Sequence, residues 1–113
     1  MPKSRFDPAV RRKIILVPEA VNDAAAAYAW YEGEAPGLGD DFLRCLEKAY
    51  ALIAEHPLHY PVRFDSFRRI LVRRFPYAVY FEHDDDTILI HYVFHCAQAP
   101  EKLSQRLKPP PEI

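Results

Sequence analysis

Arginine side chains gather in the second half of the sequence, where they could bind phosphate or carboxylate groups. The segment from residue 62 to residue 76 contains one acidic residue, Asp65, and five arginines: Arg63, Arg68, Arg69, Arg73 and Arg74. This segment is strongly basic, whereas the whole chain has a net charge of −1. A guanidinium can donate two parallel hydrogen bonds to either kind of anion. The segment therefore predicts a surface for nucleic acid or for an acidic protein segment. The alternative is a solvated strand face whose arginines pair with helix carboxylates such as Glu47 or Glu55.

Two tyrosines extend this candidate surface. Tyr77 and Tyr80 follow the arginines closely, and their rings would either stack on bases or fill one face of a sheet. The residues expected to bind a partner or nucleic acid are therefore Arg68, Arg69, Arg73, Arg74, Tyr77 and Tyr80.

Histidine and cysteine side chains do not form a recognisable metal site. His91 and His95 lie four residues apart on an expected strand, which separates them by ~13 Å, too far for one metal ion. Neither cysteine belongs to a zinc-spaced cluster, so no metal and no cofactor are expected. Cys96 follows His95 directly, and neighbouring strand residues point to opposite faces, which argues against a Cys–His nucleophile. His95 is either a hydrogen-bonded structural residue or a general acid or base at a strand end.

Two helices are expected to position these residues. An alanine-rich segment from Glu19 that ends before Ala35 predicts the first, with one face formed by Val21, Ala24, Tyr28 and Tyr31. Trp30 and Tyr31 are interpreted as packing residues. The second helix begins at Asp40 and ends near His56, and its apolar face is formed by Phe42, Leu46, Ala49 and Ile53. Proline and glycine between the two predict a tight antiparallel hairpin.

The strands are expected from β-branched runs and from a period of two. Lys13–Val17 predicts a first strand that is buried on both faces. Three later strands are expected at Arg69–Arg73, Ala78–Glu82 and Thr87–Phe94, with a turn over residues 83–86. In the first of these, Ile70 and Val72 share one face, and Arg69, Leu71 and Arg73 share the other. Pro100–Lys108 could add a short helix.

These elements predict an α+β two-layer domain in the order β-α-α-β-β-β, with an antiparallel sheet packed on the helix hairpin. The expected domain spans residues 13–108, between an N-terminal extension, 1–12, and a proline-rich tail, 109–113. A chain of 113 residues allows one such domain. Its longest apolar run, about six residues, is far too short to span a membrane. No targeting signal is recognisable and the two cysteines fit a reducing compartment, so a cytoplasmic protein is expected.

The order of elements and several short motifs together resemble the RelE/ParE superfamily of type II toxin–antitoxin toxins, also known as plasmid stabilisation proteins. The motifs run through most of the domain: Pro18-Glu19-Ala20, Trp30-Tyr31-Glu32, Pro36-Gly37-Leu38-Gly39 with Phe42-Leu43, His56-Pro57 with Tyr60-Pro61, Arg68 to Val72, Arg74-Phe75-Pro76-Tyr77 with Tyr80, and His95, Pro100 and Arg106. Phe-Pro-Tyr after an arginine-rich strand is the most specific of them.

The resemblance implies a growth-inhibiting toxin that a small antitoxin neutralises by folding over it, in a hetero-oligomer. Relatives of the RelE kind cut mRNA on the ribosome without metal, whereas those of the ParE kind inhibit DNA gyrase. If this chain were a ribonuclease, the resemblance would make His95 the acid or base and Arg69, Arg73 and Arg74 the phosphate-binding residues.

The sequence departs from the ribonuclease pattern after His95. Cys96-Ala97-Gln98-Ala99 stands where the family often has arginines and an aspartate, and no tyrosine follows Tyr92. This departure favours a ParE-like toxin with a protein target and no catalytic site. A RelE-like mRNA endonuclease and a degenerate, non-toxic family member remain as alternatives.

Overall fold

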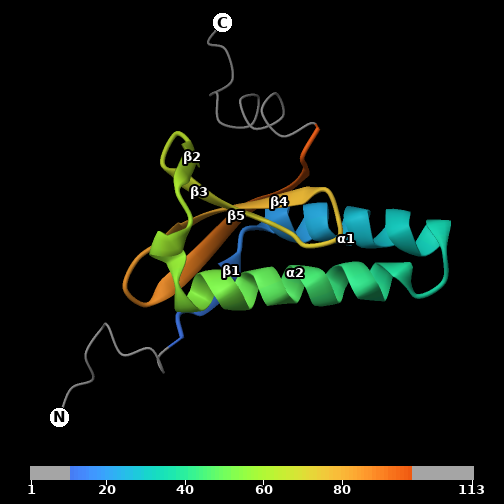
Figure 1. Cartoon of the computed structure of the whole chain (residues 1–113), viewed down its shortest axis with the longest axis horizontal. Helices are drawn as coiled ribbons and strands as arrows, with labels where there is room; N and C mark the ends of the chain where they lie inside the picture. The colour runs from blue at the N-terminus through green and yellow to red at the C-terminus, as the bar shows by residue number, and fades with distance from the viewer. Residues whose placement is uncertain (1–10, 98–113) are drawn as a thin grey trace, which may run out of the picture.

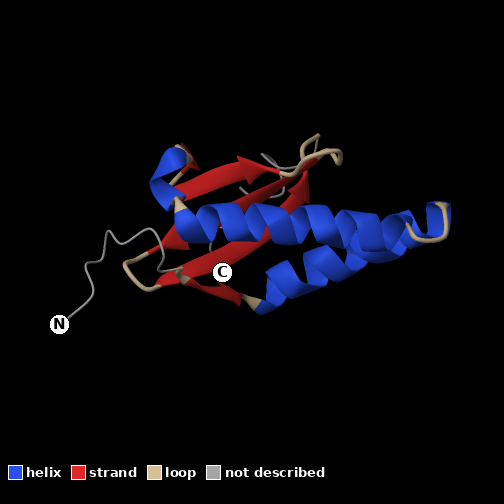
Figure 2. Ribbon diagram, turned by 60° about the horizontal axis from the view of Figure 1, so that its bottom comes forward, coloured by secondary structure: helices blue, strands red, loops and turns tan. Residues whose placement is uncertain are grey.

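A helix hairpin lies against one face of a five-stranded sheet in the computed structural model, which describes residues 11–97 (Figures 1 and 2). The expected helix over 100–108, the tail 109–113 and most of the extension 1–12 lie outside the described residues. The elements, in chain order, are β1 (Lys13–Leu16), α1 (Pro18–Glu34), α2 (Leu38–Glu55), the 3₁₀ turn η1 (Pro57–His59), β2 (Val62–Phe64), β3 (Phe67–Leu71), β4 (Tyr77–His83) and β5 (Thr87–His95). The predicted α+β architecture is confirmed, and β2 is an additional short strand that the sequence did not predict.

The sheet has the strand order β1-β5-β4-β3-β2 and is mixed. Strands β2 to β5 form an antiparallel meander, as expected, but β1 pairs with β5 in parallel. The strand β1 is not buried on both faces, contrary to the prediction from its β-branched sequence, because the helix hairpin covers only one face of the sheet (Figure 2). Ile14 and Leu16 pack against the core, whereas Ile15 is 41% exposed.

The amphipathic helix α2 buries the face that its sequence predicts. Phe42, Leu46, Ala49 and Ile53 all lie in the main core, which also includes the helix-facing side chains of β3, β4 and β5. An apolar stripe at helical spacing on an otherwise charged helix defines one inward orientation.

The inward face of α1 differs from the prediction. Ala20 and Ala27 are buried and Tyr31 packs on Phe42 and Phe75, at ring-centroid distances of 5.3 and 4.8 Å. Val21 is 51% exposed and Trp30 is 63% exposed, so the expectation that both pack inward was wrong. Alanines occur all round this helix, and the apolar periodicity therefore could not select one face.

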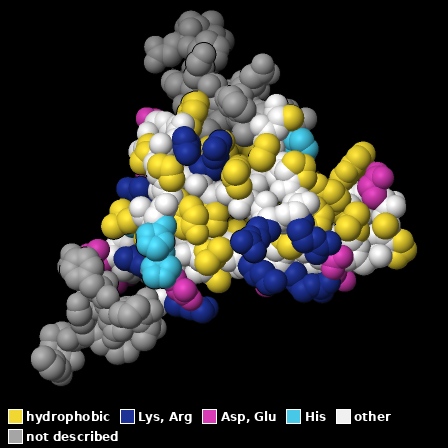
Figure 3. Space-filling view, viewed as in Figure 1, with side chains coloured by type: hydrophobic (Ala, Val, Ile, Leu, Met, Phe, Trp, Pro, Cys, Tyr) yellow, Lys and Arg dark blue, Asp and Glu magenta, His cyan; other side chains and the backbone are white. Residues whose placement is uncertain are grey.

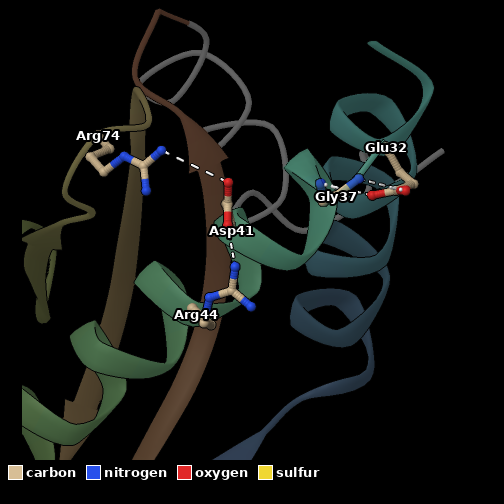
Figure 4. Close-up of polar contacts among 6 residues, drawn as sticks. Glu32, Gly37, Asp41, Arg44 and Arg74 are labelled. Carbon is tan, nitrogen blue, oxygen red and sulfur yellow. Dashed lines mark hydrogen bonds and ion pairs between the residues drawn. The ribbon is translucent and has the colours of Figure 1, made fainter. Parts of the chain in front are cut away.

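The connection between the helices is held by one carboxylate. Glu32 accepts hydrogen bonds from the backbone N–H groups of Gly37 and Gly39, both at 3.0 Å (Figure 4). These donors lie at the start of α2, where a helix favours negative charge. Gly37 has a φ of +85°, which suits glycine. The carboxylate thereby fixes where α2 begins relative to α1.

The helices also approach closely at Gly39. A Cβ atom at this position would lie 2.8 Å from Cε2 of Tyr28 and 2.9 Å from its carbonyl oxygen. Gly39→Ala should therefore lower the free energy of unfolding by about 1–3 kcal/mol. Gly33→Ala is the matched control, since a Cβ there meets nothing within 4 Å, and it should stabilise the helix by about 0.5–1 kcal/mol. Thermal unfolding followed by circular dichroism measures both. Equal effects of the two substitutions would contradict the close approach.

The turn between β4 and β5 depends on the ionised side chain of Asp84. Its Oδ1 accepts bonds from the Asp86 N–H, the Thr87 N–H and the Thr87 hydroxyl, each at 2.8 Å. The bond from the Asp86 N–H, followed by those from Thr87, lowers the pKa of this carboxyl below its ordinary value.

A lowered pKa in the folded state stabilises the protein above the ordinary carboxyl pKa, and this contribution is lost as the pH falls through the lowered value. Asp84→Ala should therefore unfold at a lower temperature than the wild type at neutral pH, and the difference should shrink on acidification. Asp86→Ala, whose side chain accepts none of these bonds, should behave like the wild type. A difference for Asp84→Ala that is independent of pH would contradict the role of the ionised carboxylate.

Candidate functional site

A groove lies between α2 and the edge of β3. It contains a cavity of about 270 Å³ lined by Cys45, Lys48, Ala49, Leu52, Ile70, Leu71, Arg73 and Arg74. A neighbouring hollow of about 440 Å³ shares Lys48, Leu52 and Arg73 and continues along α2 to Glu55. We call the two together the α2–β3 groove.

The groove has an apolar floor because one flank of α2 is left partly uncovered by the sheet. Cys45, Ala49 and Leu52 lie at helical spacing on this flank. Leu52 is 46% exposed, and Leu71 on the strand side is 56% exposed. Large apolar side chains that remain exposed around a hollow indicate a surface that a partner can cover.

The rim of the groove is basic. The first cavity is lined by three cations, Lys48, Arg73 and Arg74, and by no carboxylate. Arg74 approaches Asp41 at 3.9 Å and lies over the Phe75 ring, whereas within residues 11–97 neither Lys48 nor Arg73 takes part in an ion pair (Figure 4). The space-filling view shows lysine and arginine side chains gathered over α2 with apolar surface beside them (Figure 3). The arrangement suits an anionic ligand that also carries apolar groups.

The other arginines of the basic segment point elsewhere. Arg68 donates a hydrogen bond to the Tyr60 carbonyl at 2.8 Å and is partly buried. Arg69 is opposite Tyr80 in the β3–β4 pairing, which places it on the face of the sheet away from the helices. Because side chains alternate along a strand, arginines that are close together in the sequence lie on different faces of the sheet.

Both candidate tyrosines are involved in packing. Tyr77 is half-buried against Phe42, with ring centroids 5.1 Å apart, and burial raises the pKa of its hydroxyl, with smaller effects from Tyr31 and Asp23. Tyr80 is 3% exposed within an aromatic cluster on the sheet face away from the helices, formed by Phe67, Ala78, Tyr80, Tyr92 and Phe94. Tyr80 is therefore too buried for a base to stack on it, and Tyr77 packs against neighbouring rings.

His95 ends β5 beside Tyr77, with ring centroids 5.4 Å apart. Its Nδ1 accepts a hydrogen bond from the Ala97 N–H at 3.1 Å, which places the ring proton of the neutral imidazole on Nε2. In the described part of the chain, no hydrogen bond or ion pair joins His95 to Arg73 or Arg74. The imidazole therefore has a structural hydrogen-bond partner.

The remaining candidate chemical groups also stand apart. His91 Nε2 lies 2.8 Å from Glu82 Oε1, and Cys96 is exposed while Cys45 is buried. Among the described residues, no three His, Cys, Asp or Glu side chains gather as a metal ion would require. Within the same range, no helix has the length and apolar character to cross a membrane.

Sequence reasoning found Arg73 and Arg74 but missed the α2 side of the groove. Lys48 and Leu52 were given no role, whereas the predicted placement of Leu71 on the strand face of Arg69 is confirmed by the pairing of these residues with Ala78 and Tyr80. The available signal was Leu52, a large apolar residue outside the predicted apolar face of α2.

Comparison with known proteins gives one family match, over residues 14–100, to the model described as the ParE toxin of the type II toxin–antitoxin system parDE. No curated protein sequence matches the chain significantly.

Two solved structures share the fold. A chain of the chromosomal ParDE toxin–antitoxin system from P. aeruginosa is 15% identical with a TM-score of 0.66, covering 75% of this chain and 96% of that one. A chain of the toxin–antitoxin complex RelBE2 from Mycobacterium tuberculosis is 20% identical with a TM-score of 0.53, covering 77% of this chain and 93% of that one.

Proposed function

The chain belongs to the ParE family of type II toxin–antitoxin toxins, and from this membership we propose that it arrests growth by binding a protein target, of which DNA gyrase is the first candidate. It has no catalytic step of its own. A small antitoxin neutralises it in a cytoplasmic hetero-oligomer.

The observation that carries the proposal is the separation of the groups a ribonuclease would need. Metal-independent cleavage requires an acid–base pair and cations around one phosphate. Here His95 is bonded to the Ala97 N–H, Arg68 to the Tyr60 carbonyl, and Arg74 lies near Asp41. These contacts support a binding protein over a nuclease.

The antitoxin partner is supported by the titles of the similar structures, a ParDE system and a RelBE2 toxin–antitoxin complex. It is also supported by the α2–β3 groove, whose basic rim suits an acidic segment that folds on binding.

The test is a titration of the purified protein into cell-free translation, with mRNA 5′ ends mapped by primer extension, beside a gyrase supercoiling assay. Intact message with loss of supercoiling supports the proposal. New cleavage sites within ribosome-bound message would establish a RelE-like endonuclease in its place. A protein that affects neither and does not arrest growth would be a degenerate family member.

His95→Ala should leave growth arrest on induction unchanged, because His95 takes part in no catalytic step. Growth curves after induction, with immunoblots to equalise expression, measure this. Arg73→Ala is a parallel variant at an exposed site. If both variants fail to arrest growth but still unfold cooperatively, the result would favour a RelE-like endonuclease over the proposed function.

The complex with the antitoxin should weaken by about tenfold between ~0.05 and ~0.5 M salt, because exposed cations on the groove rim are screened. Calorimetric titration at three salt concentrations measures the slope. An affinity that does not change with salt would contradict an interface centred on Lys48, Arg73 and Arg74.

A further inference from the structure

The first hollow of the α2–β3 groove has a buried apolar floor. Its volume is about 270 Å³, and it is lined by Cys45, Ala49 and Ile70, none of which is more than 9% exposed. Leu52 also lines it and is 46% exposed. If each non-hydrogen atom takes about 30 Å³, the share of one water molecule in the liquid, the hollow has room for roughly nine such atoms. A small apolar body therefore fits it.

Two cations stand beside this floor. Lys48 and Arg73 are exposed and line both hollows, and within residues 11–97 neither takes part in an ion pair. Lysine and arginine side chains lie next to apolar surface over α2 in Figure 3. The one carboxylate that lines the second hollow, that of Glu55, pairs with Arg11 at 2.6 Å. The groove is therefore locally positive, and its two cations can share one anionic group.

The floor and the cations together define the chemistry of a small ligand. A carboxylate accepts charge-assisted hydrogen bonds from both an ammonium and a guanidinium group, while an alkyl chain attached to it covers the apolar floor. An inorganic anion such as phosphate would satisfy the cations but would leave the floor exposed to water. A sugar or a nucleobase would place polar groups against apolar side chains, where they lose hydrogen bonds to water without replacement. The hollow therefore favours a carboxylate with a short alkyl chain.

We propose that the α2–β3 groove binds a small amphiphilic carboxylate, of the size of a straight-chain acid with about eight carbon atoms. Its carboxylate lies between Lys48 and Arg73, and its alkyl chain covers Ala49, Leu52 and Ile70. The consequence for regulation rests on the proposed function, which assigns the same groove to the antitoxin. Because the ligand and the acidic segment of the antitoxin need the same cations, they compete. The concentration of the ligand thereby changes the fraction of the protein that is neutralised.

The two cysteines of the chain allow a test that is specific to the hollow. Cys45 lines it, whereas Cys96 is exposed and does not. In Cys96→Ser the only thiol is that of Cys45, and its alkylation by N-ethylmaleimide is timed with and without sodium octanoate. Octanoate at about ten times its dissociation constant should slow this reaction roughly tenfold. In the control variant Cys45→Ala, octanoate should not change the alkylation of Cys96.

The charge and the alkyl chain of the ligand are tested separately. Octan-1-ol lacks the charge and butyrate lacks half of the chain, so each should need at least about a tenfold higher concentration for the same protection. Lys48→Glu should weaken protection by octanoate about tenfold, and Lys13→Glu, an identical change on β1 at the opposite edge of the sheet, by less than about twofold. Octanoate should also weaken binding of the antitoxin encoded beside the gene, measured by fluorescence anisotropy.

Each other outcome has a definite meaning. Absence of protection, equal protection by octanoate and octan-1-ol, or equal effects of the two lysine variants would overturn the carboxylate site. Protection of Cys45 without any change in antitoxin affinity would overturn the competition. All of these results would leave the proposed function intact, provided that the protein arrests growth and the antitoxin restores it. Absence of both growth arrest and antitoxin binding would instead remove the proposed function, while protection of Cys45 by octanoate would still support the ligand site.

Discussion

The position of α2 depends on a single carboxylate that bridges two backbone N–H groups. Glu32, in the last turn of α1, accepts from Gly37 and Gly39, and it therefore sets both the first residue of α2 and its distance from α1. Gly39 allows the helices to approach to a separation that no larger residue would permit. Because α2 is straight and long, its starting point decides which flank meets β3 at the far end of the hairpin. The exposure of Leu52 beside Leu71 follows from this geometry.

The sequence correctly predicted those elements whose local residue pattern is compatible with only one structure and one orientation. Helix α2 has one apolar stripe, and the turn at residues 83–86 is dictated by an aspartate that accepts three hydrogen bonds. The face of α1 was not predictable, because alanine surrounds it and the choice is made by contacts such as that of Tyr31 with Phe75. The burial of β1 depends on the helix hairpin, which covers one face of the sheet only, and β2 is too short to produce a pattern.

For the candidate site, the sequence predicted the cationic residues but not which of them share a surface. A run of arginines indicates an anionic ligand, but strand alternation and the turn before β4 decide which of them share a surface. Arg73 and Arg74 meet Lys48 in the groove, whereas Arg69 lies on the other face of the sheet. That separation changes the chemical interpretation, since cations spread over two faces can attract a charged protein but cannot surround one phosphate. The α2 side of the groove depends on tertiary packing and leaves little trace in the sequence.

The exposed position of Trp30 has a spectroscopic consequence. It is the only tryptophan in the chain and is 63% exposed on α1. Its indole is already largely hydrated in the native state, so its fluorescence emission will resemble that of the denatured chain and will respond weakly to unfolding. The packed ring cluster of Tyr31, Phe42, Phe75 and Tyr77 provides the better intrinsic probe. Near-ultraviolet dichroism of these rings will therefore report loss of the native core where tryptophan emission does not.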